Sequence, residues 1–353
     1  MKKQLDYTIK KKHCSKRHYI LLSAVLCTLL LASCGETKKE NNKEDYTAAS
    51  SMEAQTSPTP TTQPDELINM VETEKEDAIQ TMSVVSEEGD VEPVEAEPEP
   101  VRKDEVISWN DTWEYANFSQ IHESTVTLYR SQADNRKDIV VALNAGHGTS
   151  GGESVKTQCH PDGSPKVTGG STGAGNTMAT SINSGTTLLD GTREAETVLD
   201  LALIAKEDLL NAGYDVLMIR ETEDTQLDNI ARTVIANNNA DCHISFHYDS
   251  TSSDKGFFFV SVPDVASYRA MEPVASHWNE HNMLGAAILE GARSNGVKIY
   301  GNGMMALDLT QTSYSTIPSV DVEVGDRASD HSEETQKKLA KSIVDGLNVF
   351  FAD

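Results

Sequence analysis

From residue 138 to the end of the chain, hydrophobic residues follow two alternating patterns, continuous apolar runs and amphipathic stretches with a helical period. The apolar runs predict buried strands, which we place at 139–143, 214–219, 242–247, 256–262, 304–309 and 320–324. The amphipathic stretches predict helices, which we place between Thr192 and Gly213 and at 226–237, 273–294 and 333–351. This alternation predicts one α/β domain over residues 138–353, with a central, mainly parallel (mixed) sheet flanked by helices.

Two neighbouring segments fall outside this pattern. Residues 106–137 contain five aromatic side chains, and we expect this lead-in segment to pack on the domain that follows. Residues 149–193, called the insert below, are rich in Gly, Ser and Thr and predict a loop between the first strand and the first helix.

The first residues of the chain have the pattern of an export signal. Residues 1–18 carry seven basic residues and one acidic residue, and an apolar run follows over residues 19–33. Such a run is typical of a secretion signal and is shorter than the roughly 20 residues of a membrane-spanning helix. Leu31-Ala32-Ser33-Cys34 looks like a bacterial lipobox, so residues 1–33 predict a lipoprotein signal peptide and Cys34 the lipidated residue. The alternative is a short signal anchor in which Cys34 is incidental.

Residues 34–105 predict a disordered acidic tether. They contain 20 acidic and 6 basic residues, regularly spaced prolines and few large apolar side chains. Charge repulsion and the lack of a hydrophobic core keep such segments extended. The tether would let the folded domain reach away from a lipid anchor.

The formal charge of the 353 residues is −25, which argues against binding to nucleic acid because such proteins need a basic surface. Residues 106–353 remain acidic, with 34 acids and 17 bases. We therefore expect anchoring, rather than charge attraction, to bring the domain to its substrate. After removal of the signal and acylation of Cys34, only Cys159 and Cys242 remain, too few for a disulfide framework, and whether they pair is left open.

Three polar side chains stand where a catalytic metal site is expected. His147 follows the first predicted strand, His247 ends the third, and Glu194 begins the first long helix. Binding sites in parallel sheets collect where the carboxyl ends of the strands meet loops. Two imidazoles and a carboxylate give a catalytic zinc ion three ligands and leave the fourth position open for water, whose pKa the metal lowers toward about 7.

Glu323 is an acid inside an apolar strand, Val320-Asp321-Val322-Glu323-Val324. Burying an acid is costly unless it is paired, bound to a metal or used in a reaction. Near zinc, Glu323 would act as a general base and then as a general acid. The alternative is a buried ion pair with a helix arginine such as Arg232.

Residues 138–350 resemble the zinc-dependent N-acetylmuramoyl-L-alanine amidases of bacterial cell-wall turnover, the group called amidase type 3. The stretches that carry the resemblance are Val141 to Gly148 (VALNAGHG), Glu194 to Ala202 (EAETVLDLA), Gly213 to Arg220 (GYDVLMIR), Ile230-Ala231-Arg232, Ala236-Asn237, Ala240-Asp241, Ser245-Phe246-His247 and Val322 to Gly325 (VEVG). The resemblance implies one zinc ion per chain, held by His147, Glu194 and His247, with Glu323 as the catalytic acid and base. Glu194 is preferred to Glu196 because the family's ligand stands five residues before the position of Leu199.

The chain departs from the family pattern at several positions. Asp249 stands where the family usually has Asn, and the residues after Gly325 differ. His243 and Asp321 occupy positions that are apolar in the family. Strand alternation puts each on the same face as a site residue, so we expect His243 and Asp321 to pair, either beneath the metal ligands or as a core contact. Arg232 is a further candidate for a residue that supports the metal ligands from beneath.

These features predict an extracytoplasmic, lipid-anchored amidase that cleaves the bond between N-acetylmuramic acid and L-alanine of peptidoglycan. Its partners would be peptidoglycan and the membrane, the latter through the N-terminal lipid, most simply at the outer face of a Gram-positive cytoplasmic membrane. One alternative is a non-catalytic peptidoglycan-binding or regulatory module that keeps the fold. Another is a zinc peptidase or deacetylase with a different substrate.

Overall fold

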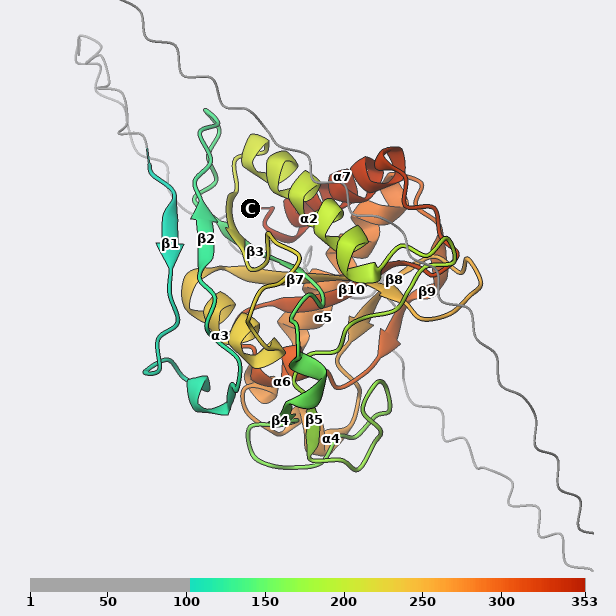
Figure 1. The fold of residues 1–353 in the computed structure, drawn as a ribbon. Helices are drawn as coiled ribbons and strands as arrows, with labels where there is room; N and C mark the ends of the chain where they lie inside the picture. Colours follow the sequence, from blue (N-terminus) through green and yellow to red (C-terminus); the bar gives the residue numbers. More distant parts are fainter. Residues whose placement is uncertain (1–101, 353) are drawn as a thin grey trace, which may run out of the picture. The chain divides into compact units, whose positions relative to one another are not determined.

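A mixed sheet of eight strands runs through residues 102–352, the part of the 353-residue chain that the computed structural model describes (Figure 1). Across the sheet, the strands are β1 (Glu105–Ile107), β2 (Val126–Tyr129), β6 (Asp215–Met218), β3 (Val140–Ala145), β7 (Cys242–Asp249), β10 (Ser319–Asp326), β8 (Phe257–Ser261) and β9 (Ile299–Ala306). The central four, from β6 to β10, are parallel, whereas β2 and β8 run antiparallel to their central neighbours. The prediction of a mainly parallel, mixed sheet is confirmed. The predicted signal, Cys34 and the tether up to residue 101 lie outside the described residues.

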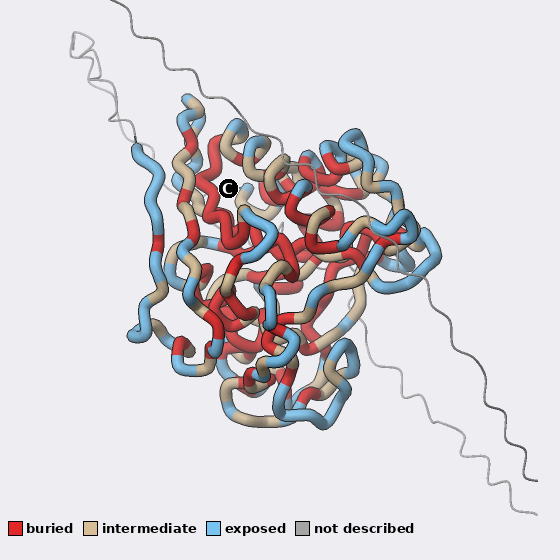
Figure 2. Tube along the Cα trace, viewed as in Figure 1, coloured by how far each residue is buried: buried red, intermediate tan, exposed pale blue. Residues whose placement is uncertain are grey.

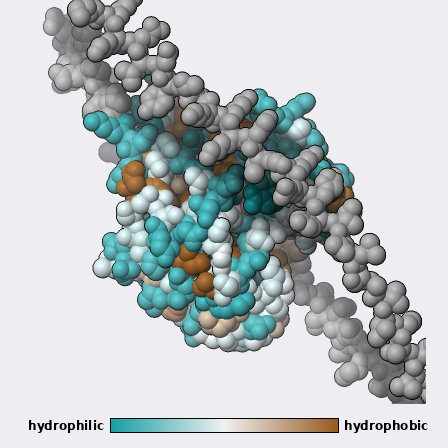
Figure 3. Space-filling view, in the orientation of Figure 1, coloured by the Kyte–Doolittle hydropathy of each residue, from teal (hydrophilic) through white to brown (hydrophobic). Residues whose placement is uncertain are grey.

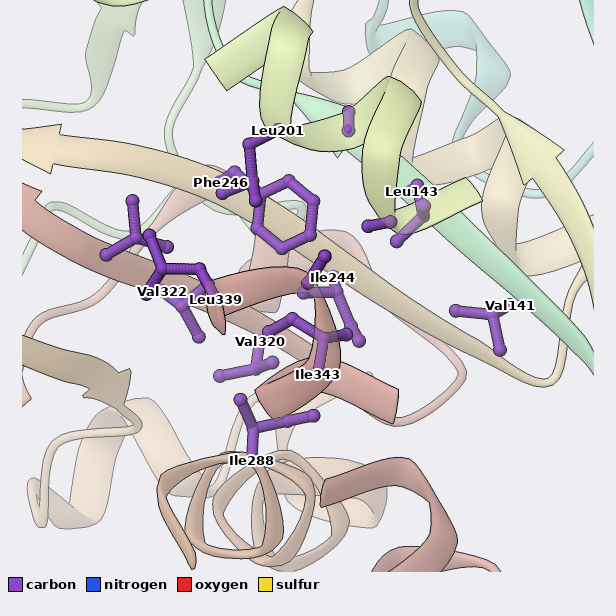
Figure 4. Packing of buried hydrophobic residues seen from close by; sticks show 14 of the residues in the cluster. Val141, Leu143, Leu201, Ile244, Phe246, Ile288, Val320, Val322, Leu339 and Ile343 are labelled. Atoms are coloured by element: carbon purple, nitrogen blue, oxygen red, sulfur yellow. The ribbon is translucent and has the colours of Figure 1, made fainter. Parts of the chain in front are cut away.

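Helices cover both faces of the sheet. The helices that pack on the larger core are α2 (Glu194–Asn211), α5 (Val274–Ser294) and α7 (Glu333–Phe350). Figure 4 shows Leu201 of α2, Ile288 of α5 and Ile343 of α7 meeting the side chains of β7 and β10. The opposite face carries α3 (Asn229–Asn239), and α6 (Thr310–Tyr314) packs beside it.

Side-chain alternation gives the two faces of the central strands different characters. Val320, Val322 and Val324 of β10 point into the larger core, so Asp321 and Glu323 face the side of α3 and α6. The same alternation in β7 buries Ile244 and Phe246 in that core and turns Ser245 and His247 to the other face. The parallel strands therefore gather polar side chains on one face, near their carboxyl ends.

The lead-in segment is joined to the domain by strand pairing and by one buried carboxylate. Strands β1 and β2 extend the sheet beyond β6, and β1 forms a largely exposed edge (Figure 2). Asp228 caps α3 by accepting a hydrogen bond from the N–H of Ala231, and it also accepts the N–H groups of Gln120 and Ile121. The N-terminus of α3 is thereby tied to the lead-in segment.

The elements that the sequence pattern did not predict are all short. They are the strands β1, β2, β4 (Lys156–Gln158) and β5 (Met178–Thr180), the helices α4 (Ala266–Arg269) and α6, and the 3-10 turns η2 (Ala116–Phe118) and η3 (Gly152–Ser154). Three to five residues are too few to show a hydrophobic period. Strand β9 covers Ile299–Ala306 rather than the predicted 304–309. Its first half was missed because Gly301 and Gly303 interrupt the hydrophobic run there.

Cys159 and Cys242 are both buried free thiols. Among the helices of residues 102–352, none combines the length and hydrophobicity needed to cross a bilayer. On the face shown in Figure 3, hydrophobic residues form only small, separate patches among hydrophilic ones.

The close packing of α5 on α7 gives a test of the fold. A Cβ atom added at Gly291 of α5 would lie 2.2 Å from the carbonyl oxygen of Ser342 in α7. We expect Gly291→Ala to lower the free energy of unfolding by about 1–3 kcal/mol, because the obstacle is backbone that cannot rotate away. Lys338→Ala, at an exposed position of α7, should change it by less than about 0.5 kcal/mol. Urea unfolding measures both, and a gain of stability in Gly291→Ala would contradict the packing.

Candidate functional site

The loop after β3 presents His147 at the carboxyl end of the sheet. His147 has a left-handed backbone conformation, with a φ of 65°, and is buried. Gly146 before it allows close approach, because a Cβ there would lie 2.2 Å from Cε1 of His247. Gly148 after it has a φ of 71°. Gly146 thus lets the two histidines meet, whereas Gly148 leaves room for Arg220, because a Cβ there would lie 2.8 Å from its Nη1.

Two buried arginines hold this loop through its carbonyl groups. Arg232 of α3 donates to the carbonyl oxygens of Ala145, at 3.0 Å, and His147, at 2.6 Å. Arg220, after β6, donates to the carbonyl oxygens of Ala145 and Gly146, both at 2.9 Å. It also reaches the carbonyl oxygen of Ala195 in the first turn of α2, at 2.7 Å. Burial lowers the pKa of Arg220 to about 10, with a further effect of Arg193, and the pKa of Arg232 to about 9, with a further effect of Arg220.

Three potential metal ligands converge in front of this loop. Nε2 of His147 lies 2.7 Å from Oε1 of Glu194, and Nδ1 of His247 lies 2.9 Å from the same His147 nitrogen and 3.2 Å from the same oxygen. Within the described residues, these three form the group of His, Cys, Asp and Glu side chains whose arrangement suits a metal ion. Two nitrogens and one oxygen are a common ligand set of catalytic zinc.

The end of the insert orients two of the three ligands. Nδ1 of His147 lies 3.0 Å from the carbonyl oxygen of Asn183, which can only accept, so the neutral ring carries its proton on Nδ1. Its Nε2 lone pair then points at the other two ligands. The carboxylate of Glu194 accepts the N–H of Thr186, at 2.7 Å, and the N–H of Tyr248, at 3.0 Å. These contacts turn Nε2 of His147 and the carboxylate of Glu194 toward each other.

Acidic side chains dominate the electrostatics of the site. Burial raises the pKa of Glu323 well above its usual value, opposed by His247 and reinforced by Asp321 and Glu194. Burial also raises the pKa of Asp321, against the effect of His247. Burial would raise the pKa of Glu194, but the neighbouring His147 and His247 outweigh it and lower this pKa. Burial would lower the pKa of His247, but Asp321 and Glu194 raise it to about 10. This concentration of negative charge suits a bound cation.

The ligands open into a cavity of about 650 Å³. His147, Glu194 and His247 line it together with Asp321 and Glu323. Oε2 of Glu323 is buried and has no hydrogen-bond partner among the described residues, so no other protein group occupies this oxygen. The cavity gives a metal ion at the three ligands an open side.

His243 and Asp321, which were expected to pair, have different neighbours. In the parallel register of β7 and β10, His243 is opposite Ser319 and Asp321 is opposite Ser245. Nδ1 of His243 lies 3.5 Å from Oγ of Ser319, whereas Oδ2 of Asp321 lies 3.6 Å from Nε2 of His247. The predicted pair of His243 and Asp321 is therefore wrong, because alternation fixes the face of a side chain but not its neighbour across the strands.

The alternative ion pair of Glu323 with Arg232 is also wrong, because the guanidinium of Arg232 is used on the loop carbonyls. Of the two candidate glutamates at the start of α2, Glu194 meets the histidines and Glu196 pairs with Arg193 on the surface. Asp249, where an asparagine was expected, forms an ion pair with Lys255. Among the described residues, none of these four acids forms an ion pair with Arg232.

A buried polar chain under the site was not foreseen from the sequence. The side-chain amide of Asn144 donates to Ser245, whose hydroxyl donates to the side-chain oxygen of Gln311 in α6. Asp308, which binds the insert, was also missed. Its flanking residues Leu307 and Leu309 are apolar, the same signal that drew attention to Glu323. The main-chain groups of Asn183 and Thr186 carry no such signal.

A protein-family model described as N-acetylmuramoyl-L-alanine amidase matches residues 141–349. Among solved structures, the N-acetylmuramyl-L-alanine amidase Ami1 from Mycobacterium smegmatis is 19% identical, with a TM-score of 0.50, and the match covers 62% of this chain and 98% of that one. Ami1 from Mycobacterium abscessus is 19% identical, with a TM-score of 0.49 and coverage of 61% and 99%. The catalytic domain of CwlV from Bacillus (Paenibacillus) polymyxa var. colistinus is 20% identical, with a TM-score of 0.40 and coverage of 60% and 96%. A search of curated proteins found no match. The M. smegmatis structure shows that the fold is shared.

The arginine that holds the His147 loop provides a second test. We expect Arg232→Lys to lower the free energy of unfolding by about 2–4 kcal/mol, because an ammonium group cannot reach the separate carbonyls that the guanidinium binds. Arg193→Lys is the matched control, since Arg193 is exposed and its ion pairs are screened by water; its change should stay within about 0.5 kcal/mol. Equal effects of the two substitutions in urea unfolding would show that the loop does not depend on Arg232.

Proposed function

The chain belongs to the N-acetylmuramoyl-L-alanine amidase family, whose model covers residues 141–349, and we propose that it is a zinc-dependent member that cleaves the bond between N-acetylmuramic acid and L-alanine in peptidoglycan. The observation that carries the proposal is the convergence of His147, Glu194 and His247 at one wall of a cavity that Glu323 also lines. Family membership makes the enzyme an amidase of peptidoglycan. Zinc, the bond cleaved and the residue roles are the proposal.

The three converging side chains fit zinc as its ligands. The proton of His147 is held on Nδ1 by the carbonyl of Asn183, so Nε2 is free to coordinate. Glu194 is fixed by two main-chain N–H groups and cannot turn away. When bound, zinc supplies Lewis-acid chemistry that polarises a carbonyl group and makes water more acidic.

Glu323 is the proposed acid and base. It is opposite His247 in the register of β7 and β10, so its carboxylate lies on the same face as the ligands. Its buried, acidic surroundings raise its pKa well above the usual value, first through burial. A carboxyl group with such a pKa can take a proton from the attacking water and give it to the departing amine of L-alanine.

Acting on peptidoglycan implies action outside the cytoplasm. We propose that residues 1–33 are the export signal, that Cys34 carries the lipid and that the tether runs from residue 34 to residue 104. The bound of 105 expected from the sequence is one residue too long, because Glu105 begins β1. The composition of these residues supports the proposal. The membrane would then be reached through the lipid, at the outer face of a Gram-positive cytoplasmic membrane.

Release of stem peptide from purified peptidoglycan tests the proposed function. We expect Glu323→Gln to lower the rate by roughly 10²- to 10⁴-fold while the zinc content, measured by metal analysis, stays at one ion per chain. Removing the metal with a chelator should abolish release, and adding zinc should restore it. Metal binding without release that depends on Glu323 would favour the alternative, a non-catalytic peptidoglycan-binding module.

Asp321 gives a separate test of the metal site. We propose that its carboxylate, 3.6 Å from Nε2 of His247, orients that ring for coordination through Nδ1. Asp321→Asn should weaken zinc binding by roughly 10- to 100-fold in a competition with a chromophoric chelator. Asp200→Asn, at an exposed position of α2, is the control and should leave zinc affinity unchanged. Equal affinities in the two variants would exclude a role for Asp321 in positioning the ligand.

A further inference from the structure

The insert forms one wall of the cavity that contains the candidate metal site. Lys166 and residues 169–172 line the cavity from the insert, and His147, Glu194 and His247 line the same cavity. The wall is therefore in reach of a substrate whose scissile bond lies at the metal ligands.

One buried carboxylate fastens this wall to the body of the domain. Asp308, between β9 and α6, is fully buried and lies 3.1 Å from Nζ of Lys166 and 3.2 Å from Nε2 of His160. It accepts the N–H groups of Val167, at 2.5 Å, and Thr168, at 3.2 Å. The hydroxyl of Thr168 donates to the same carboxylate and accepts the N–H of Asp308, at 2.9 Å. Every one of these partners belongs to the insert, so Asp308 holds it at a single point.

After Thr168, the main-chain N–H and C=O groups of residues 169–172 have no hydrogen-bond partner among the described residues. A Cβ atom added at Gly169 or Gly170 would meet nothing within 4 Å, so the chain here faces open space. Gly170 has a φ of 146°, which only glycine adopts readily. The segment thus offers unpaired donors and acceptors on a backbone that a ligand can approach closely.

Four aliphatic side chains also line the cavity. They come from β8 and from the end of β9 and the loop after it: Val260, Met305, Leu307 and Leu309. Free main-chain groups on one side and aliphatic side chains on the other suit an extended peptide, which pairs through its own amides and buries alternate side chains. This chemistry differs from that of the acidic, histidine-rich part of the cavity.

We propose that residues 169–172 bind the peptide part of the substrate through their main chain, and that Asp308 is the positioning residue that holds this wall in place. The proposal rests on the proposed function, because it takes the substrate to be a muramoyl peptide. The wall would contact stem residues beyond L-alanine. Substrates that lack those residues should therefore not depend on Asp308.

Steady-state kinetics of the zinc-loaded, full-length protein tests the wall with two substrates, N-acetylmuramoyl pentapeptide and N-acetylmuramoyl-L-alanine. Asp308→Asn and Thr168→Val should each raise KM for the pentapeptide roughly tenfold, with kcat nearly unchanged, through loss of hydrogen bonds that hold the wall. KM for the short substrate and the affinity for zinc should stay unchanged. Thr168→Ser, which keeps the hydroxyl, should restore the wild-type KM, and the exposed Asp162→Asn should leave both substrates unaffected.

Substitution inside the wall tests the main chain directly. Ser171→Pro removes one N–H group, whereas Ser171→Ala removes only the hydroxyl. We expect Ser171→Pro to raise KM for the pentapeptide several-fold and Ser171→Ala to leave it near the wild-type value. Because Ser171 is exposed, both variants should fold even if Asp308→Asn does not. Equal changes for the long and the short substrate, or none in Thr168→Val and Ser171→Pro, would overturn the proposal.

Binding of the free stem pentapeptide, measured by calorimetry, separates this proposal from the proposed function. If the wild type releases no peptide from peptidoglycan but binds the pentapeptide more tightly than Thr168→Val does, the wall is supported and the amidase activity is refuted. If the wild type releases peptide but binds the pentapeptide no more tightly than Thr168→Val does, the activity is supported and the wall is refuted.

Discussion

The geometry of the site depends on two buried guanidinium groups that bind main-chain carbonyls. The loop after β3 turns with a left-handed residue at His147, and such a turn leaves carbonyl oxygens that no helix or strand satisfies. Arg232 and Arg220 satisfy them, and Arg220 also binds the carbonyl of Ala195, one residue after Glu194. Arg220 therefore sets the position of the His147 loop relative to α2, the helix that carries Glu194. The cost of burying the two charges is offset by these hydrogen bonds, which would be lost together if the loop moved.

The parallel register of the central strands supplies the rest of the site. His247 and Glu323 lie opposite each other in β7 and β10, so they share a face and a height in the sheet. The residues directly before them in sequence, Phe246 and Val322, point into the larger core. Hydrophobic packing on one face thus fixes the register that brings the polar residues of the other face together. A slip of either strand by one residue would bury the polar groups and expose the core.

The sequence was sufficient for the central strands and for the residues that meet in the site, because both have strong local signals. Long apolar runs predict buried strands, Glu323 interrupts such a run, and His147 and His247 stand at the ends of two others. The contacts that orient the ligands were not predictable, since Asn183 and Thr186 act through their main chain and any residue could supply those groups. The error about His243 had a related cause. Its face follows from alternation, but its neighbour, Ser319, depends on a register that only the folded sheet defines.

The insert connects the metal ligands with the proposed peptide wall. Its final residues hold His147 and Glu194, and its middle is fastened by Asp308 at the edge of the same cavity. These two attachments belong to one segment with little regular structure, so tertiary contacts rather than secondary structure determine its position. The carboxylates of Glu194, Asp321 and Glu323 line the cavity beside the two histidines, and residues 169–172 add main-chain groups without hydrogen-bond partners among the described residues. In the proposed enzyme, a cation at the candidate ligands would offset the negative charge of these carboxylates, so that an anionic substrate could lie along the wall without being repelled.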